Sequence, residues 1–522
     1  MLLLRKSEEK SENMAAGVVY TWGMGKSGEL GHDQIDREGI CALPQRVPRL
    51  SRVVAVACGE RASAAIVQGG ALFTWGAGRG GRLGHGNEED CPVPRCVDAL
   101  RVAGAVVSIS VGESHMAAVL ETAAAAHTGD GCGGGAVYCW GNGAKGCLGT
   151  GDGNSGVGVG VDGVGVGGGG GRGRGSTLPL RVLAEADGTP LAGVVSVSAG
   201  FRYCLAVGRG GELFAWGDGC GGKLGLGDER ERARGAVRVS SLGPGTAHGA
   251  VASASCGSLY SAAITRDGGL LCWGYNGSGN LGVGHRRGCV TPQLVGGALE
   301  GARVTSVACC AGQINPAALG AAAPAKLAGR EGPTTLATTA DGRLFAWGSC
   351  HKGKLGNLLA KTLVADEDEL LPYLVGIDGK DEGGGGGGAA AAEASEGIFQ
   401  VEQTAAAPRW RDAATAKPTS VAAAHADDAA RGAIVQVTAA SIHSGCVGAD
   451  GQVYTWGCGS DGRMGVLKFL EGLHGQRSRM KCYVSQPTAV TIALGGAAAK
   501  QLCASRRHMI CLVVRERSLQ AL

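Results

Sequence analysis

The stretch Val19-Tyr-Thr-Trp22-Gly-Met-Gly-Lys-Ser-Gly28-Glu-Leu30-Gly31 decides how this sequence folds, because it recurs along the chain. Each copy has a tryptophan, then glycine at positions +1, +6 and +9 and leucine or methionine at +8. The tryptophans in this slot are Trp22, Trp75, Trp140, Trp216, Trp273, Trp347 and Trp456. Matches at four fixed offsets in every copy exceed what a glycine-rich background produces by chance. The chain is therefore built from seven copies of one unit.

Two further patterns extend each unit, and successive tryptophans are at least 53 residues apart. A Pro-x-x-Val step follows most copies, as at Pro44 and Val47, and two apolar runs separated by a turn come next, most clearly in Val53–Ile66. Short alternating apolar runs bounded by glycine predict β-strands. Asp-Gly pairs precede the tryptophan strand and predict hairpin turns in which both central residues have a positive φ. These pairs are Asp267-Gly268, Asp341-Gly342 and Asp450-Gly451.

Four strands per unit and seven units predict an all-β fold, a seven-bladed β-propeller of four-stranded antiparallel blades. The tryptophan and the leucine at +8 are the expected core residues between neighbouring sheets. The chain starts inside a unit and ends on the strand pair Leu502–Val514, with no tryptophan phrase after it. We therefore expect the N- and C-terminal strands to share one blade and close the ring, which removes both sheet edges.

The unit boundaries give a domain plan. We expect a disordered N-terminal segment at 1–17, the propeller at 18–514 and a C-terminal tail at 515–522. Low-complexity insertions rich in glycine or alanine interrupt the units near 121–135, 151–177, 313–333 and 376–430. Such segments cannot bury enough apolar area to offset the entropy lost on ordering, so we expect flexible loops.

Composition excludes several classes of protein. The chain has 522 residues and a formal net charge of only +4, which gives no general electrostatic case for a nucleic-acid or membrane partner. No apolar run approaches the length of about 18 residues that a membrane helix needs. None of the 20 cysteines is spaced C-x2-C, so we expect no metal site and read many of them as small buried hydrophobic residues in a reducing compartment. No catalytic constellation stands out, so we expect neither a cofactor nor an enzymatic reaction.

Together, Trp-Gly-x-Gly-x-x-Gly-x-Leu-Gly, Pro-x-x-Val and Val-x-x-Val-x-x-Gly-x-x-His resemble the repeats of the regulator of chromosome condensation family, from Val18 to Val514. The resemblance implies the same propeller. It is less specific for function, because the family includes the exchange factor for the small GTPase Ran, a plant ultraviolet-B receptor, modules of giant ubiquitin ligases and plain interaction propellers. The receptor's Gly-Trp-Arg-His-Thr motifs are absent from this sequence.

The turn after the first apolar run of each unit is expected on one face of the propeller, where function usually lies. Basic and aromatic residues in these turns suit a partner with acidic patches. The resemblance implies a second role, because acidic and histidine residues in such turns of the Ran exchange factor help to expel nucleotide. The alternative for the histidines is that they only hydrogen-bond the turn. The candidate partner-binding residues are Glu60, Arg61, Glu113, His115, Arg202, Tyr203, Tyr260, His443, Arg507 and His508.

The sequence therefore predicts a monomeric, non-catalytic interaction propeller in the cytoplasm or the nucleus, which binds a protein partner through one face. The alternative is a guanine-nucleotide exchange factor for a Ran-like small GTPase. It would act without covalent chemistry, by stabilising the nucleotide-free GTPase. A nucleic-acid or chromatin partner is not expected but stays open, and the two main hypotheses differ in whether nucleotide release is accelerated.

Overall fold

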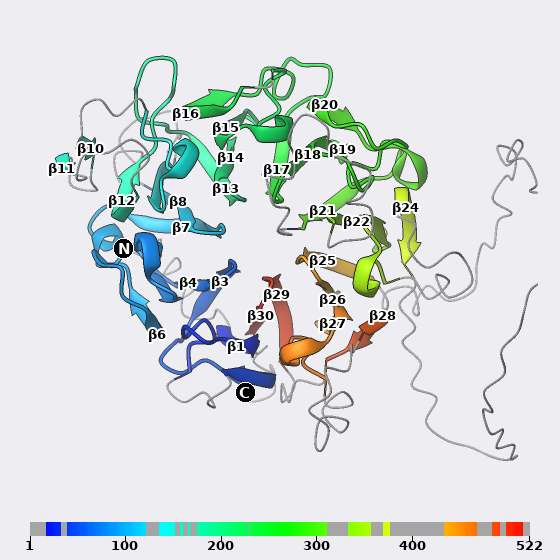
Figure 1. Ribbon diagram of the computed structural model, residues 1–522, viewed down its shortest axis with the longest axis horizontal. Helices are drawn as coiled ribbons and strands as arrows, with labels where there is room; N and C mark the ends of the chain where they lie inside the picture. The colour runs from blue at the N-terminus through cyan, green and yellow to red at the C-terminus, as the bar shows by residue number, and fades with distance from the viewer. Residues whose placement is uncertain are drawn as a thin grey trace, which may run out of the picture.

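The computed structural model describes residues 17–32, 39–121, 135–151, 157–159, 165–167, 175–228, 230–310, 332–356, 369–375, 433–466, 483–490 and 497–514. These residues form seven four-stranded antiparallel sheets arranged as blades around a central axis (Figure 1). The predicted seven-bladed all-β propeller is confirmed. Among the described residues, no helix is long and apolar enough to cross a membrane.

Blades 1 to 3 follow one another along the chain. Blade 1 contains β3 (Val53–Cys58), β4 (Ala62–Val67), β5 (Leu72–Gly76) and β6 (Cys91–Cys96). Blade 2 contains β7 (Ala105–Val111), β8 (His115–Glu121), β9 (Ala136–Gly141) and β12 (Ser176–Arg181). Blade 3 contains β13 (Val194–Ala199), β14 (Tyr203–Gly208), β15 (Leu213–Asp218) and β16 (Arg232–Arg238).

Blades 4 to 6 repeat this order, and blade 7 combines the two ends of the propeller. Blade 4 contains β17 (Val251–Cys256), β18 (Tyr260–Thr265), β19 (Leu270–Gly274) and β20 (Cys289–Leu294). Blade 5 contains β21 (Val304–Cys309), β22 (Thr334–Thr339), β23 (Leu344–Gly348) and β24 (Glu369–Val375). Blade 6 contains β25 (Ile434–Ala439), β26 (His443–Gly448), β27 (Val453–Cys458) and β28 (Tyr483–Ala489). Blade 7 contains β1 (Gly17–Met24), β2 (Ile40–Arg46), β29 (Ala498–Ala504) and β30 (His508–Val514).

Short helical turns connect some of these strands. One is the α-helix α2 (Asp98–Arg101), between β6 and β7. The others are 3-10 turns: η1 (Arg79–Gly81), η3 (Ala144–Gly146), η4 (Cys220–Gly222), η5 (Gly297–Leu299), η8 (His351–Gly353) and η10 (Ser460–Gly462).

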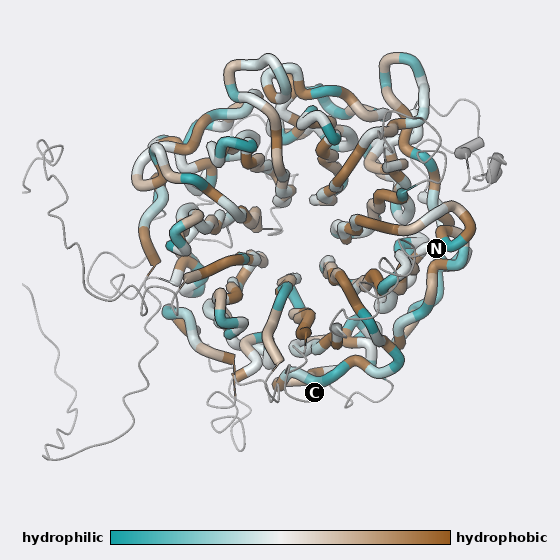
Figure 2. Tube along the Cα trace, turned by 180° about the vertical axis from the view of Figure 1, so that it is seen from behind, coloured by the Kyte–Doolittle hydropathy of each residue, from teal (hydrophilic) through white to brown (hydrophobic). Residues whose placement is uncertain are grey.

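The ring closes by pairing across the two ends of the propeller. Blade 7 has the strand order β2-β1-β30-β29, and Gly17 of β1 pairs with Val514 of β30. The predicted closure by a shared blade is confirmed, and β1 begins at Gly17 rather than at residue 18. In every blade the first strand of the repeat lies nearest the central axis of the ring, and hydrophobic residues run along the inner strands (Figures 1 and 2).

The repeated tryptophan joins each blade to the one before it. All seven tryptophans are fully buried. Trp75 Nε1 donates a hydrogen bond of 2.9 Å to the backbone carbonyl of Glu29. Glu29 lies seven residues after Trp22. Gly31, at +9 from Trp22, has φ +76°, and a Cβ there would lie 2.9 Å from Trp75 Nε1. The glycine is therefore required both by its left-handed backbone and by the close approach of the next indole.

The Asp-Gly hairpins form, but their turn type differs from the prediction. Only the glycine has a positive φ, for example +91° at Gly268, and Asp267 does not. Gly268 N–H donates to Thr265 O at 2.9 Å, which closes a type I-like turn, and the glycine follows as a left-handed bulge residue. Because this longer turn needs a positive φ at one residue instead of two, Asp267 keeps a negative φ.

The predicted tail at 515–522, the first sixteen residues, and most of the insertions near 121–135, 313–333 and 376–430 lie outside the described residues. In the insertion near 151–177, the structure describes a two-stranded antiparallel pair, β10 (Val157–Val159) and β11 (Gly165–Gly167), where the sequence predicts a flexible loop. Alternating Val-Gly sequence allows this local pairing, since each valine has a β-branched side chain.

Candidate functional site

The connections between the first and second strands that the structure describes lie at one end of the propeller. We call this end the turn face. Its described residues are 59–61, 112–114, 200–202, 257–259, 440–442 and 505–507. In blade 5 the same connection leaves β21 at Cys310 and returns at Gly332, and 311–331 lie outside the described residues. The turn face carries all ten candidate residues or the strand ends next to them.

Half of the candidate residues are buried rather than displayed. Their relative exposures are 0 to 1%, so in this structure they cannot meet a partner at the surface. Each begins the second strand of its blade, directly after the turn, and its side chain lies in the seam between two blades. Among the buried histidines, His508 lies within hydrogen-bond distance of its own turn, at Ser505, as the alternative for the histidines expects. The buried candidates are His115, Tyr203, Tyr260, His443 and His508.

Four of these buried side chains make hydrogen bonds to the next blade. Tyr203 Oη donates to Tyr260 O at 2.6 Å, and Tyr260 Oη donates to Thr334 O at 2.7 Å. His508 Nε2 lies 2.8 Å from Ser63 Oγ in blade 1. In the same way, His115 Nε2 lies 3.1 Å from Cys204 Sγ in blade 3.

His443 is the exception. Within the described part of the chain neither of its ring nitrogens has a hydrogen-bond partner. His508 Nδ1 is 2.9 Å from Ser505 Oγ, three residues earlier. Around His443, Ala440 stands in the place of Ser505 and Met509 stands in the place of Ser63. Neither side chain has a hydroxyl group. Burial lowers the pKa of His508 to about 3 and that of His443 well below its usual value, so both rings are neutral at physiological pH.

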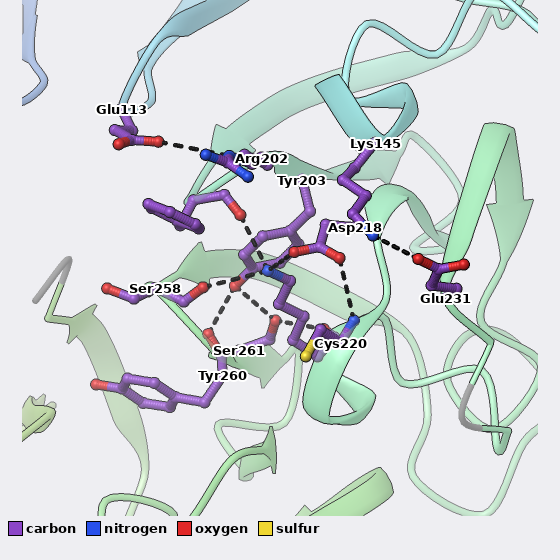
Figure 3. A network of polar contacts seen from close by, with 12 residues as sticks. Glu113, Lys145, Arg202, Tyr203, Asp218, Cys220, Glu231, Ser258, Tyr260 and Ser261 are labelled. Carbon is purple, nitrogen blue, oxygen red and sulfur yellow. Dashed lines mark hydrogen bonds and ion pairs between the residues drawn. The ribbon is translucent and has the colours of Figure 1, made fainter. Parts of the chain in front are cut away.

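The other five candidates are exposed or partly exposed, and they come from neighbouring blades 7, 1, 2 and 3. They are Glu60, Arg61, Glu113, Arg202 and Arg507. Arg202 Nε lies 3.9 Å from Glu113 Oε2 across the seam between blades 2 and 3 (Figure 3). Burial raises the pKa of the Glu113 carboxyl, and Arg202 opposes that shift. Arg202 has a left-handed φ of +61°, and its guanidinium lies 4.9 Å from the Phe201 ring centroid, which restrains the side chain.

Sequence reasoning missed a second set of residues beneath the turn face, at position +7 from the tryptophan. Arg82 Nη1 donates to the carbonyl of Glu113 at 3.1 Å and so brings a guanidinium from blade 1 to the turn of blade 2. Burial lowers the pKa of Arg82. A signal exists in the sequence, because a polar or ionisable residue stands between the fixed glycine at +6 and leucine at +8. The set is Glu29, Arg82, Cys147, Lys223, Asn280, Lys354 and Arg463.

Lys223 shows what this position does to the turns. Its side chain is fully buried, and Nζ lies 2.9 Å from Asp218 Oδ2 and donates to Phe201 O at 3.0 Å (Figure 3). A third bond, to Ser258 O at 3.4 Å, reaches the turn of blade 4. Burial lowers the pKa of Lys223, and Asp218 opposes that shift. The ammonium group therefore holds the Phe201–Arg202 turn in place from below.

In the described ranges, no group of three or more histidine, cysteine or acidic residues is placed to hold a metal ion. Every cysteine in those ranges is a free thiol. His32 and His85 bond the hairpin threonines Thr21 and Thr74 at 2.9 Å, so they serve the repeat rather than a site.

Comparison with known proteins identifies the repeat. The model of the regulator of chromosome condensation (RCC1) repeat matches residues 16–66, 69–119, 267–313 and 450–512, and a second model of the same description matches 251–280. These matches show that the chain contains RCC1 repeats, and the described strands form a seven-bladed β-propeller.

Several curated relatives share the repeat. E3 ubiquitin-protein ligase HERC2 of Homo sapiens is 32% identical over 295 residues, which is 56% of this chain and 5% of HERC2. Ultraviolet-B receptor UVR8 of Arabidopsis thaliana is 28% identical over 66% of this chain and 63% of the receptor. RCC1 domain-containing protein RUG3, mitochondrial, also of Arabidopsis thaliana, is 28% identical over 65% of this chain and 67% of RUG3. The chain thus spans a small part of HERC2 and less than two thirds of UVR8.

Solved structures share the fold. Yeast RCC1 (Prp20), seen bound to Kap60, superposes with a TM-score of 0.61 at 16% identity and covers 98% of this chain and 92% of that one. Human WBSCR16 gives a TM-score of 0.61 at 17% identity, with 96% and 100% covered. At these identities the likeness shows the propeller fold.

Proposed function

We propose that this propeller is a non-catalytic interaction protein that binds an acidic surface of a protein partner through its turn face. The observation that carries the proposal is a group of partly or fully exposed arginines on blades 7, 1 and 3, one of which reaches the turn of blade 2. We call it the arginine arc, and it consists of Arg61, Arg82, Arg202, Arg506 and Arg507.

The charge balance of the arc favours an acidic partner. In the turns at 59–61, 112–114, 200–202 and 505–507, four arginines stand against the two carboxylates Glu60 and Glu113, which leaves an excess of two positive charges. Arg82 stands in the outer connection of blade 1, between β5 and β6, together with the acidic residues Glu88–Asp90. The described turns of blades 4 and 6 are neutral and buried, for example at Leu259 and Ile442. Among the turns that the structure describes, the excess positive charge therefore lies on one side of the turn face.

The arc is also preorganised. Arg82 and Arg202 are restrained by their contacts to Glu113 and Phe201. Guanidinium groups that are held before binding lose less conformational entropy on meeting a carboxylate, and arginine with aromatic neighbours is the composition of interface hot spots. The repeat family supports a role in protein interaction, and one relative of solved structure, Prp20p of Saccharomyces cerevisiae, has binding properties toward Gsp1p and histones.

The test is binding of a short fluorescent glutamate-rich peptide, followed by anisotropy at low and physiological salt. A triple variant that combines Arg61→Glu, Arg202→Glu and Arg507→Glu reverses three charges. It is expected to bind the peptide at least tenfold more weakly, a loss of about 1.4 kcal/mol in binding free energy. The matched control is Arg101→Glu, an exposed arginine in α2 at the opposite end of the blade, which should bind as the wild type does. Equal loss in the control, or equal binding of the glutamine version of the peptide, contradicts the proposal. Tighter binding of a single-stranded oligonucleotide than of the peptide assigns the arc to nucleic acid instead.

The second candidate is nucleotide exchange on a Ran-like GTPase, and it is favoured by the partly exposed Glu60 and Glu113 on the same face. Its test is release of a fluorescent GDP analogue from a Ran-type GTPase. Dose-dependent acceleration that Glu113→Ala weakens supports exchange, and no acceleration leaves the interaction role. We further propose a monomer in the cytoplasm or nucleus. The relative RUG3 carries the word mitochondrial in its name, so fractionation should include mitochondria.

A further inference from the structure

Cys58 and Cys503 pack against one hydrophobic cluster at the seam between blade 7 and blade 1, beside the blade that closes the ring. Cys503 belongs to β29 and Cys58 to β3. Their strands are neighbours across the seam, since Val56 N–H donates to Gln501 Oε1 at 2.9 Å. Cys503 Sγ lies 3.4 Å from the carbonyl oxygen of Val56. Both cysteines are partly exposed.

The other seams show how these two positions relate. Ser198 occupies the place of Cys503, and its Oγ accepts the backbone N–H of Cys256, which occupies the place of Cys58, at 3.0 Å. The first side chain of such a pair therefore points at the backbone of the second. At the remaining seams at least one of the two positions is not a cysteine. These pairs are Ala57 with Val111, Ser110 with Ala199, Ser198 with Cys256, Ser255 with Cys309, Ala308 with Ala439, and Thr438 with Ala504.

We propose that Cys58 and Cys503 are a redox modification site, at which a small-molecule disulfide oxidises the pair to an intramolecular disulfide that locks the ring. One protein thiol loses its proton, attacks the small disulfide and releases one small thiol, which leaves a mixed disulfide. The second protein thiol then loses its proton, attacks the protein sulfur and releases the second small thiol. Two electrons pass from the cysteines to the small disulfide, and each released thiolate takes up one proton.

The consequence lies at the closing blade. The hairpin of β29 and β30 is held to the N-terminal part of the chain by the pairing of β30 with β1 and by side-chain packing, and not by a covalent bond between these described strands. A covalent bond between residues 58 and 503 would tie β29 directly to blade 1 and restrict the unfolded chain. Burial raises the pKa of Cys58 and raises that of Cys503 to about 12, so the reaction is expected to be faster at alkaline pH. This inference is independent of the proposed partner.

The experiment treats the folded full chain with oxidised glutathione, blocks remaining thiols with an alkylating reagent and maps disulfide-linked peptides by mass spectrometry without reduction. The expected result is a linked peptide pair that contains Cys58 and Cys503 and that disappears on reduction. The variants Cys503→Ser and Cys58→Ala carry residues that other blades have at these positions, so they should fold. Each should lack the linked pair.

A second readout is the midpoint of urea unfolding. It should rise on oxidation of the wild type and of the control variant Cys256→Ser, and should not rise in Cys503→Ser. Complete alkylation of both thiols after prolonged oxidation overturns the proposal. A stable mixed disulfide with glutathione on both Cys58 and Cys503 also overturns the proposal. A linked peptide that joins Cys503 to its neighbour Cys511 overturns it as well.

Discussion

Trp22 Nε1 donates a hydrogen bond to the backbone carbonyl of Arg463, 3.0 Å away in space and 441 residues later in the chain. The same bond joins every other tryptophan of the repeat to the preceding blade, for example Trp456 to Lys354 O at 2.8 Å. The residue at +7 thus has two roles. Its carbonyl anchors the next blade, and where it is Arg82, Lys223 or Lys354 its side chain also donates to a carbonyl of the turn face.

We predict that Gly465→Ala destabilises the closing seam. A Cβ on Gly465 would lie 2.8 Å from Trp22 Nε1, and the residue has φ +66°. The expected loss in free energy of unfolding is about 2 kcal/mol or more, from backbone strain and steric overlap. Urea denaturation measures it. Gly296→Ala is the control, because its Cβ meets nothing within 4 Å and its φ is −99°. Similar losses in both variants would contradict the close contact as the cause.

Ala440→Ser should stabilise the protein by supplying His443 with the partner that Ser505 gives His508. The expected gain in free energy of unfolding is about 1 kcal/mol, because a buried nitrogen acquires a hydrogen bond. Ser505→Ala is the reciprocal variant and should cost about 2 kcal/mol, since it leaves His508 Nδ1 unpaired. Calorimetry or urea denaturation compares them. Destabilisation by Ala440→Ser would show that the seam at His443 has no room for a hydroxyl group.

Asp218→Asn should destabilise the protein strongly, because it leaves the ammonium of Lys223 buried without its carboxylate. The expected loss is about 3 to 5 kcal/mol, and the added substitution Lys223→Met should recover most of it. The control is Asp228→Asn, which removes an ion pair to Arg230 whose side chains are 45% and 36% exposed, and it should cost under about 1 kcal/mol. A double variant as unstable as Asp218→Asn alone would mean that the carboxylate, and not the uncompensated charge, matters.

Stability should fall on acidification through His508. Its pKa is about 3 in the folded protein, against an ordinary value of 6.5. Between these values the unfolded state binds more protons, so this contribution is complete above pH 6.5 and is lost progressively toward pH 3. His508→Gln should reduce the slope of stability against pH in this window, by at most about 1.4 kcal/mol per pH unit. Identical slopes in the wild type and the variant would contradict a neutral buried His508. Parallel urea titrations at several pH values provide the measurement.

The candidate site separates what a local pattern can predict from what it cannot. The turns and their place on one face follow from the repeat, so Arg61, Arg202 and Arg507 are found from sequence. The burial of Tyr203 and His508 cannot be predicted from the repeat, because the neighbouring blade forms the other side of the seam in which each side chain lies. Arg82 was missed for the same reason, since its contact with Glu113 crosses between blades.

By itself the sequence determined the number of blades, their strand pattern and their closure, because glycine, tryptophan and alternating apolar residues act within one unit and are repeated in each. Which side chains face solvent, and which side chains of different blades lie together, depends on the tertiary structure. These contacts join residues such as Ser63 and His508, 445 positions apart, and no local periodicity records the distance between them.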